Sequence, residues 1–215
     1  KHFEWNDGRL NYDNNFKVHS KGLDYNHVSL RNIAIGIDNL SYRVPNLVMD
    51  LRGCRFNEQS GIAVDALAGK IALDSTKLLL QRFYFKTPHS YLRAKVSLDL
   101  KTFAKDNSGK FNVSLSGKIG KPDLMHFMSK MPSTFIKQWP NRSLTISGTA
   151  IGNMQAVCFS SLSVNLPTAF NIKAKGVVAN LDKIKKLRGS LNFRAHAYKM
   201  GFAMSMLPKN ITKEI

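Results

Sequence analysis

The stretch Leu92–Lys101, LRAKVSLDLK, decides the fold class of this chain. Apolar residues occupy every second position and alternate with charged or hydroxyl-bearing ones, so successive side chains fall on opposite faces of a β-strand. One apolar face and one wet face are typical of a half-buried antiparallel strand. The apolar positions are Leu92, Ala94, Val96, Leu98 and Leu100.

The pattern repeats along the chain after a turn-like segment, Lys105–Lys110. There Phe111, Val113 and Leu115 alternate with asparagine and serine, which predicts a hairpin partner for the first strand. About a dozen short alternating runs of this kind predict a mostly β chain built from successive hairpins. The other runs are 33–37, 47–51, 62–64, 78–80, 144–150, 162–166, 170–178, 191–197 and 200–206.

Two segments interrupt the alternation with helical spacing. From Asp123 to Met131 apolar residues recur every three or four positions, and Pro132 ends the pattern. Residues 181–188 place three apolar residues on one side and four cations elsewhere, which predicts a short basic helix. Residues 1–22 alternate weakly and form a leading segment without an assigned element, so residues 1–215 are interpreted as one elongated β-rich unit.

Composition narrows the function classes. The 215 residues contain no apolar run near the roughly 20 residues of a membrane-spanning helix. The six histidines share no metal-ligand spacing with cysteine or carboxylate residues, and neither a nucleophile elbow nor a P-loop is present. We therefore expect a non-enzymatic protein without a metal or cofactor. Because the chain opens at Lys1, we expect a mature or excised piece of a longer protein.

The net charge is +18, and residues 101–215 alone carry 18 basic and 4 acidic groups. Such a field favours an acidic partner: nucleic acid, anionic lipid or acidic protein. The densest cluster, Lys183, Lys185, Lys186 and Arg188, has no accompanying nucleic-acid-binding motif, so a solvated basic helix is favoured over a nucleic-acid site.

Cys54 and Cys158 are far apart in sequence and form no zinc or redox motif. A long-range disulfide is one interpretation, and simple packing of two thiols in apolar strands is the favoured one.

The alternating pattern does not decide what covers the apolar faces of the strands. A closed sandwich or barrel, in which apolar faces meet each other, is favoured by alternation alone. The alternative is a bent open sheet that lines an apolar trough.

A family resemblance favours the trough. The segments Leu23–Leu30, Ile33–Leu40, Ser60–Gly69 and Thr87–Leu92 resemble, in order and spacing, the TamB branch of the AsmA-like envelope proteins of Bacteroides-type bacteria. In the second half Pro122–Leu124, Leu144–Asn153 and Gly176–Leu181 are similar as well. Residues 1–215 include no counterpart of that family's membrane anchor or C-terminal outer-membrane-facing domain, so the resemblance implies an internal piece of a much longer chain.

The resemblance implies a curved, antiparallel, taco-like sheet whose open groove carries phospholipid between the inner and outer membranes and supports outer-membrane assembly. It implies a periplasmic fragment of an inner-membrane-anchored protein, with phospholipid or another anionic lipid and outer-membrane assembly proteins as partners. The cationic cluster 183–188 is expected to contact headgroups. The expected groove residues are Leu92, Ala94, Val96, Leu98, Leu100, Phe111, Val113, Leu115, Leu144, Ile146, Leu162, Val164, Phe170 and Ile172.

A competing hypothesis is a scaffold that binds a partner by adding a strand at an exposed sheet edge.

Overall fold

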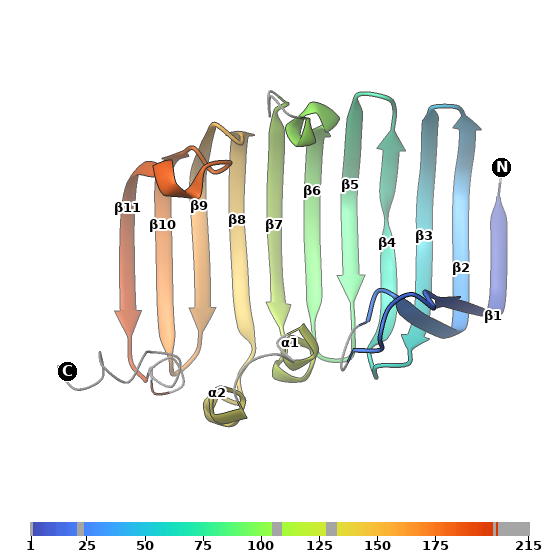
Figure 1. Cartoon of the computed structure of the whole chain (residues 1–215), viewed down its shortest axis with the longest axis horizontal. Helices are drawn as coiled ribbons and strands as arrows, with labels where there is room; N and C mark the ends of the chain where they lie inside the picture. The colour runs from blue at the N-terminus through green and yellow to red at the C-terminus, as the bar shows by residue number, and fades with distance from the viewer. Residues whose placement is uncertain (1, 21–23, 105–108, 128–132, 200, 202–215) are drawn as a thin grey trace.

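The computed structural model describes residues 2–20, 24–104, 109–127, 133–199 and 201. They form one eleven-stranded sheet in which each strand pairs antiparallel with its neighbours in sequence (Figure 1). The strands are β1 Phe3–Asp13, β2 His27–Arg43, β3 Asn46–Glu58, β4 Ala63–Leu73, β5 Lys77–Lys86, β6 Tyr91–Asp99, β7 Phe111–Ile119, β8 Leu144–Asn153, β9 Ala156–Leu166, β10 Phe170–Ala179 and β11 Arg188–Ala197. The helical elements are η1 Leu100–Phe103, α1 Lys121–Phe127, α2 Ser133–Gln138 and η2 Ile184–Lys186.

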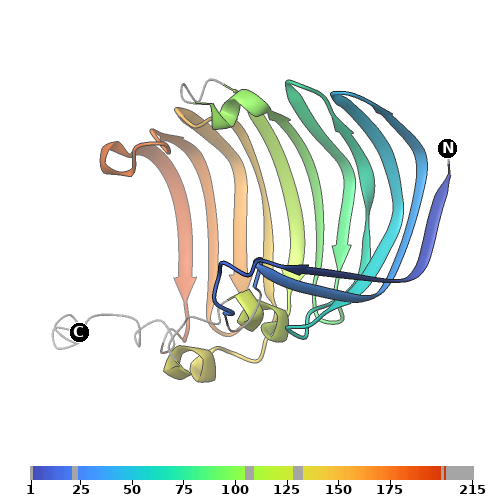
Figure 2. The same ribbon diagram turned by 45° about the vertical axis from the view of Figure 1, so that its right-hand side comes forward.

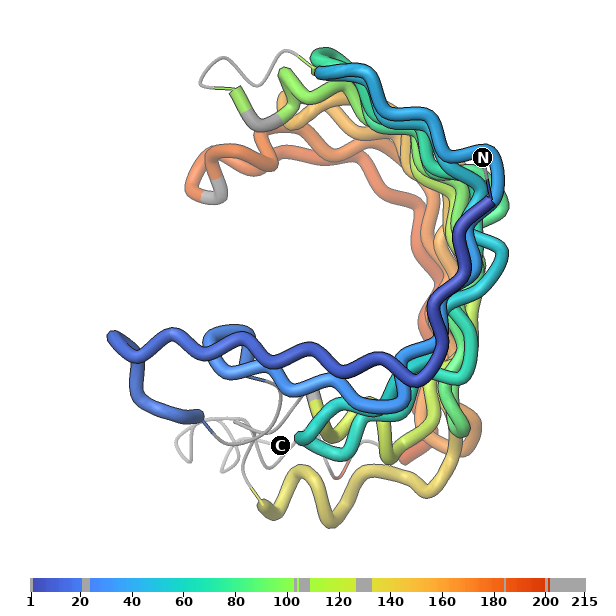
Figure 3. Tube along the Cα trace, turned by 90° about the vertical axis from the view of Figure 1, so that its right-hand side faces the viewer, coloured from blue at the N-terminus to red at the C-terminus, as the bar shows by residue number. Residues whose placement is uncertain are grey.

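The sheet is bent into a U, open on one side, as the view along the strand order shows (Figures 2 and 3). The eleven strands follow one another along the axis of this trough, and ten spacings of about 4.8 Å give a length of roughly 48 Å. The prediction of a mostly β, curved and open antiparallel sheet is therefore confirmed, and the closed sandwich is not formed.

β-Bulges bend the strands. Register shifts interrupt seven of the ten strand pairs, whereas the pairs β6–β7, β7–β8 and β10–β11 are regular. Asp7 in β1 and Asn32 in β2 both have positive φ and lie beside the pair Gly8–Ile33. Because a bulge bends its strand and increases the local twist, the two adjacent bulges turn both strands at one level into the lower arm of the U (Figure 3).

The largest buried cluster lies at the lower end of the sheet. It contains Phe135, which lies in α2, and Trp139, which follows that helix, packed on Leu166 and Ala169. The partly buried side chains of Leu144 and Phe170 border this cluster. Helix α1 is anchored through Asp123, whose carboxylate accepts hydrogen bonds from the hydroxyls of Thr87 and Ser90 in the β5–β6 turn.

The predicted helical segments differ from the observed ones. The helix expected at 123–131 is present as α1, Lys121–Phe127, while 128–132 lie outside the described residues. The second helix, α2, follows Pro132 and was not expected.

The helix expected at 181–188 is wrong: the segment contains one 3-10 turn, η2, and Arg188 begins β11. Ala179 and Arg188 are directly paired, so the intervening residues must reverse the chain across one strand spacing of about 4.8 Å, which two helical turns do not do.

The leading segment is also structured, because β1 pairs with β2. Its weak alternation has a physical cause: every residue of β1 except Gly8 is exposed, so neither face required apolar side chains. The strand expected at 200–206 falls almost entirely outside the described residues.

Candidate functional site

Apolar side chains line up across the sheet in rows, because directly paired residues of an antiparallel sheet share a face. The central row passes through Ala94 and Leu115 and runs from β5 to β11. Its members are Phe83, Ala94, Leu115, Gly148, Leu162, Ala174 and Phe193.

Two further rows flank the central one on the same face. One contains Phe85, Leu92, Gly117, Ile146, Val164, Ile172 and Ala195. The other contains Leu80, Val96, Val113, Ala150, Phe159, Gly176 and Leu191. We call the surface made by these three rows the groove face.

The groove face is the concave side of the U. Helices α1 and α2 extend from the lower ends of β7 and β8 toward the open side (Figure 3). The side chains that they pack against, Leu144, Leu166 and Phe170, alternate in phase with the groove face. The opposite, convex face carries exposed polar residues such as Arg93, which lies 5.6 Å from the centroid of the Tyr84 ring.

The side chains of the groove face are partly covered by their neighbours but are not sealed from solvent. All fourteen expected groove residues are half-buried, and none belongs to the fully buried set. In the described part of the chain only seven hydrophobic residues are buried, and no second layer of sheet covers the rows. The accessible surface is 14728 Å², compared with about 10,000 Å² expected of a compact monomer of this mass.

The structure brings most of the expected groove residues together. Nine of the fourteen lie in the three rows defined above, and Leu98 and Phe111 form a directly paired extension toward the upper rim. Leu144 and Phe170 are on the same face, but they contact the buried cluster around Phe135 and Trp139. They therefore mark the lower boundary of the groove face. Leu100 lies in η1, beyond the end of the strand.

Sequence reasoning missed the contribution of β5 and β11 to this surface. Phe83 and Phe85 are out of phase with Leu78 and Leu80, because a bulge at Arg82, where φ is positive, shifts the alternation by one residue. The available signal in the sequence was the change of phase after Arg82, where the aromatic residues Phe83 and Phe85 occupy odd positions after apolar residues at even ones.

The expected headgroup residues lie at the rim of the trough. Lys183, Lys185, Lys186 and Arg188 are all exposed and occupy the connection at the upper ends of β10 and β11 (Figure 1). The Lys183 ammonium lies 3.8 Å from the carboxylate of its neighbour Asp182. This arrangement keeps the cations beside the groove rather than within it.

The two cysteines are both free. Cys54 lies in β3 and Cys158 in β9, six strand positions apart, which is roughly 29 Å at 4.8 Å per strand. Burial raises the pKa of the Cys54 thiol, which keeps it protonated.

Among the described residues no helix is long and apolar enough to span a membrane. Comparison with protein-family models, with curated proteins and with solved structures found no match to this chain.

Proposed function

We propose that this chain shelters the acyl chains of phospholipid on its groove face, as a non-enzymatic segment of a bacterial envelope protein. The observation that carries the proposal is the set of continuous apolar rows on the concave face of a single-layer sheet. Water in contact with these rows is unfavourable, and a flexible apolar ligand that fills the trough removes that contact.

The dimensions of the trough suit an acyl chain. A leaflet of a bilayer has about half of the ~30 Å hydrocarbon thickness, so the roughly 48 Å trough is longer than one lipid tail. Burial of each methylene contributes about 0.8 kcal/mol, so a 16-carbon tail gains on the order of 10 kcal/mol before ordering costs.

Charge supports an anionic headgroup. The net charge is +18, and the cations at 183–188 are exposed at the rim next to the apolar rows. A phosphate held at this rim stays hydrated while its acyl chains enter the groove.

We further propose that the chain acts in the periplasm as part of a TamB-like, inner-membrane-anchored bridge that moves lipid toward the outer membrane and supports its assembly. An open trough whose strands follow one another in a single row is compatible with a ligand that slides along the strand order (Figures 1 and 2).

The test is the lipid content of the purified chain. The protein is purified from a Gram-negative bacterium, transferred to a volatile buffer and examined by native mass spectrometry, and its organic extract is analysed for phospholipid. We expect phospholipid bound to the folded chain and released by extraction. A chain that carries no lipid, and takes up none from phospholipid vesicles, would contradict the proposal.

A second candidate function is strand addition at the β11 edge. All ten residues of β11 are exposed, and Phe193, at 69%, presents an aromatic ring from the groove face at the edge of the sheet. A partner strand that paired with β11 would extend the rows. Native mass spectrometry separates the candidates, since a protein partner without lipid favours strand addition.

A further inference from the structure

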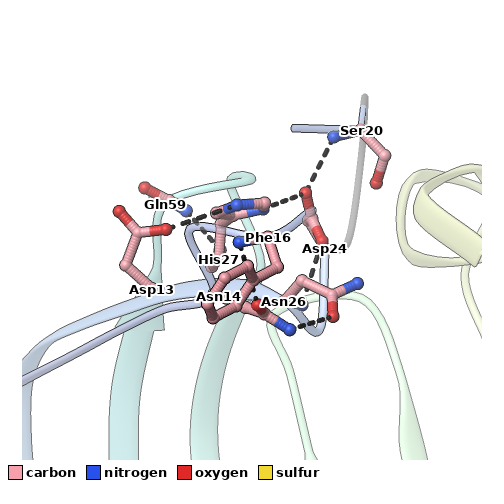
Figure 4. Close-up of polar contacts among 8 residues, drawn as sticks. All are labelled: Asp13, Asn14, Phe16, Ser20, Asp24, Asn26, His27 and Gln59. Carbon is pink, nitrogen blue, oxygen red and sulfur yellow. Dashed lines mark hydrogen bonds and ion pairs between the residues drawn. The ribbon is translucent and has the colours of Figure 1, made fainter. Parts of the chain in front are cut away.

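A cluster of titratable side chains lies where β1 ends and β2 begins (Figure 4), whereas the groove rows run from β5 to β11. Asp13, the last residue of β1, is directly paired with His27, the first residue of β2. His27 is only 3% exposed and Asp24 is 7% exposed, although Asp24 lies in the connection that precedes β2 and His27 is the first residue of that strand. A buried imidazole between two carboxylates requires an explanation, because burial of charge is costly unless the charge is compensated.

The first carboxylate orients the ring. His27 Nδ1 lies 2.9 Å from Asp24 Oδ2, and Asp24 also accepts hydrogen bonds from the backbone N–H groups of Ser20 at 2.7 Å and Asn26 at 3.0 Å. The Ser20 N–H and His27 hold the pKa of Asp24 well below its ordinary value. Because an ionised carboxylate only accepts hydrogen bonds, Nδ1 carries a proton and the ring is fixed in one orientation.

The second ring nitrogen points at further donor atoms. His27 Nε2 lies 3.3 Å from Asp13 Oδ1. The imidazole of His19 is stacked on that of His27, with 3.6 Å between ring centroids. One ligand atom from each of Asp13, His19 and His27 lies within 4.8 Å of the other two.

We propose that Asp13, His19 and His27 bind a divalent transition-metal ion, with zinc as the best fit, and that Asp24 positions His27. The ion binds His27 Nε2 in place of a proton, while the Nδ1–H group keeps its hydrogen bond to the Asp24 carboxylate. A histidine ligand whose other nitrogen donates to a carboxylate is the common arrangement in protein zinc sites. Two imidazoles and one carboxylate suit zinc, and a water completes the tetrahedron.

The geometry requires one adjustment. Ligand atoms around a tetrahedral zinc with bonds of about 2.0–2.1 Å lie roughly 3.4 Å apart, so the three donors must close in by up to about 1.4 Å from the present limit. The His19 ring must also rotate out of the stack so that its nitrogen lone pair faces the ion. Both Asp13 and His19 are exposed, and this leaves them free to move toward the buried His27.

The site would fasten the connection between the first two strands. Asn14 N donates to Asn26 O at 2.8 Å, and Gln59 Nε2 from the β3–β4 turn donates to His27 O at 2.6 Å. An ion held by Asp13, His19 and His27 therefore ties the connection to the end of β1 and, through His27, to the next turn. This part of the chain is the tip of the lower arm (Figure 3).

The test uses the full chain without an affinity tag, stripped with EDTA and titrated with ZnCl2 by isothermal calorimetry. We expect one zinc ion per chain and a rise in the unfolding temperature. Asp13→Asn and His19→Gln should each weaken zinc binding at least tenfold, and Asp24→Asn should weaken it about 10–100-fold. The matched control is His2→Gln, because His2 contacts the Asp38 carboxylate at 2.5 Å but belongs to no three-ligand cluster among the described residues.

Two results would overturn the proposal. The first is no zinc binding by the wild-type chain. The second is zinc binding that His19→Gln and Asp13→Asn leave unchanged, since both residues are exposed and their variants should fold. X-ray absorption at the zinc edge adds an independent readout: two imidazole nitrogens at about 2.0–2.1 Å are expected, and a shell without imidazole contradicts the assignment.

Discussion

Val113→Glu is the most direct perturbation of the groove face. Val113 lies in the middle of β7, is half-buried, and is directly paired with Val96 on one side and Ala150 on the other. A carboxylate at this position places a charge between apolar neighbours. A lipid tail bound there must either give up its contact with this part of the groove face or remove water from the carboxylate, and both weaken binding. The adjacent residue, Ser114, is exposed on the convex face, so Ser114→Glu adds the same charge to the same strand and serves as control.

The expected magnitude follows from the area that the substitution spoils. If three methylenes of a tail lose their apolar contact, at about 0.8 kcal/mol each, binding weakens by about 2.4 kcal/mol, or roughly 50-fold. The cost to the fold is smaller, about 1 kcal/mol, because Val113 is only half-buried and a full valine burial contributes about 1.5–3 kcal/mol. Lipid binding and folding are therefore separable at this site.

The assay is photocrosslinking from a benzophenone amino acid placed at Leu162, two strands away on the central row, in the presence of labelled phospholipid vesicles. Val113→Glu should lower the crosslinked fraction strongly, the double variant Val96→Glu with Val113→Glu should abolish it, and Ser114→Glu should leave it unchanged. Circular dichroism checks that each variant keeps its sheet. Equal crosslinking by Val113→Glu and Ser114→Glu would refute the groove.

Three further predictions concern the fold. The side-chain hydroxyl and backbone N–H of Thr76 lower the pKa of Asp74. The stability that the Asp74 carboxylate contributes is therefore present above its ordinary pKa of 3.8 and is lost as the pH falls through the lower pKa of the folded state. The difference in urea midpoint between wild type and Asp74→Asn should be constant from pH 7 to about 5 and should shrink on further acidification. Asp123→Ala leaves two hydroxyls of the β5–β6 turn without their acceptor and should lower the free energy of unfolding by about 1–3 kcal/mol in urea titrations, and an unchanged midpoint would contradict the anchoring of α1. Gly152→Ala should destabilise by about 1–3 kcal/mol, because φ is 150° and the new Cβ would lie 2.1 Å from Ala156 O, whereas Gly53→Ala, with nothing within 4 Å, should be nearly neutral; similar melting temperatures for the two would argue against this backbone geometry.

Much of the architecture follows from local pattern. The alternation in Leu92–Lys101 and Phe111–Ser116 predicted both the strands and the face that each side chain occupies, since a strand has a period of two regardless of its surroundings. Short polar connections between such strands predicted neighbour-to-neighbour pairing, and the sheet order confirms it. Nine expected groove residues consequently lie in the three aligned rows.

Other features depend on where distant residues meet. The choice between an open U and a closed sandwich rests on bulges such as those at Asp7, Asn32 and Arg82, and a single extra residue in one strand leaves little trace in composition. The segment 181–188 has helical spacing, yet the pairing of Ala179 with Arg188 overrides it. The cluster of Asp13, His19 and His27 has no recognisable spacing either, because strand pairing brings the first and last together and the connection folds the second back. The sequence alone thus determined most of the strands and the apolar faces of the central ones, while tertiary structure decided how the sheet bends and which polar groups meet, since both require contacts between residues far apart in the chain.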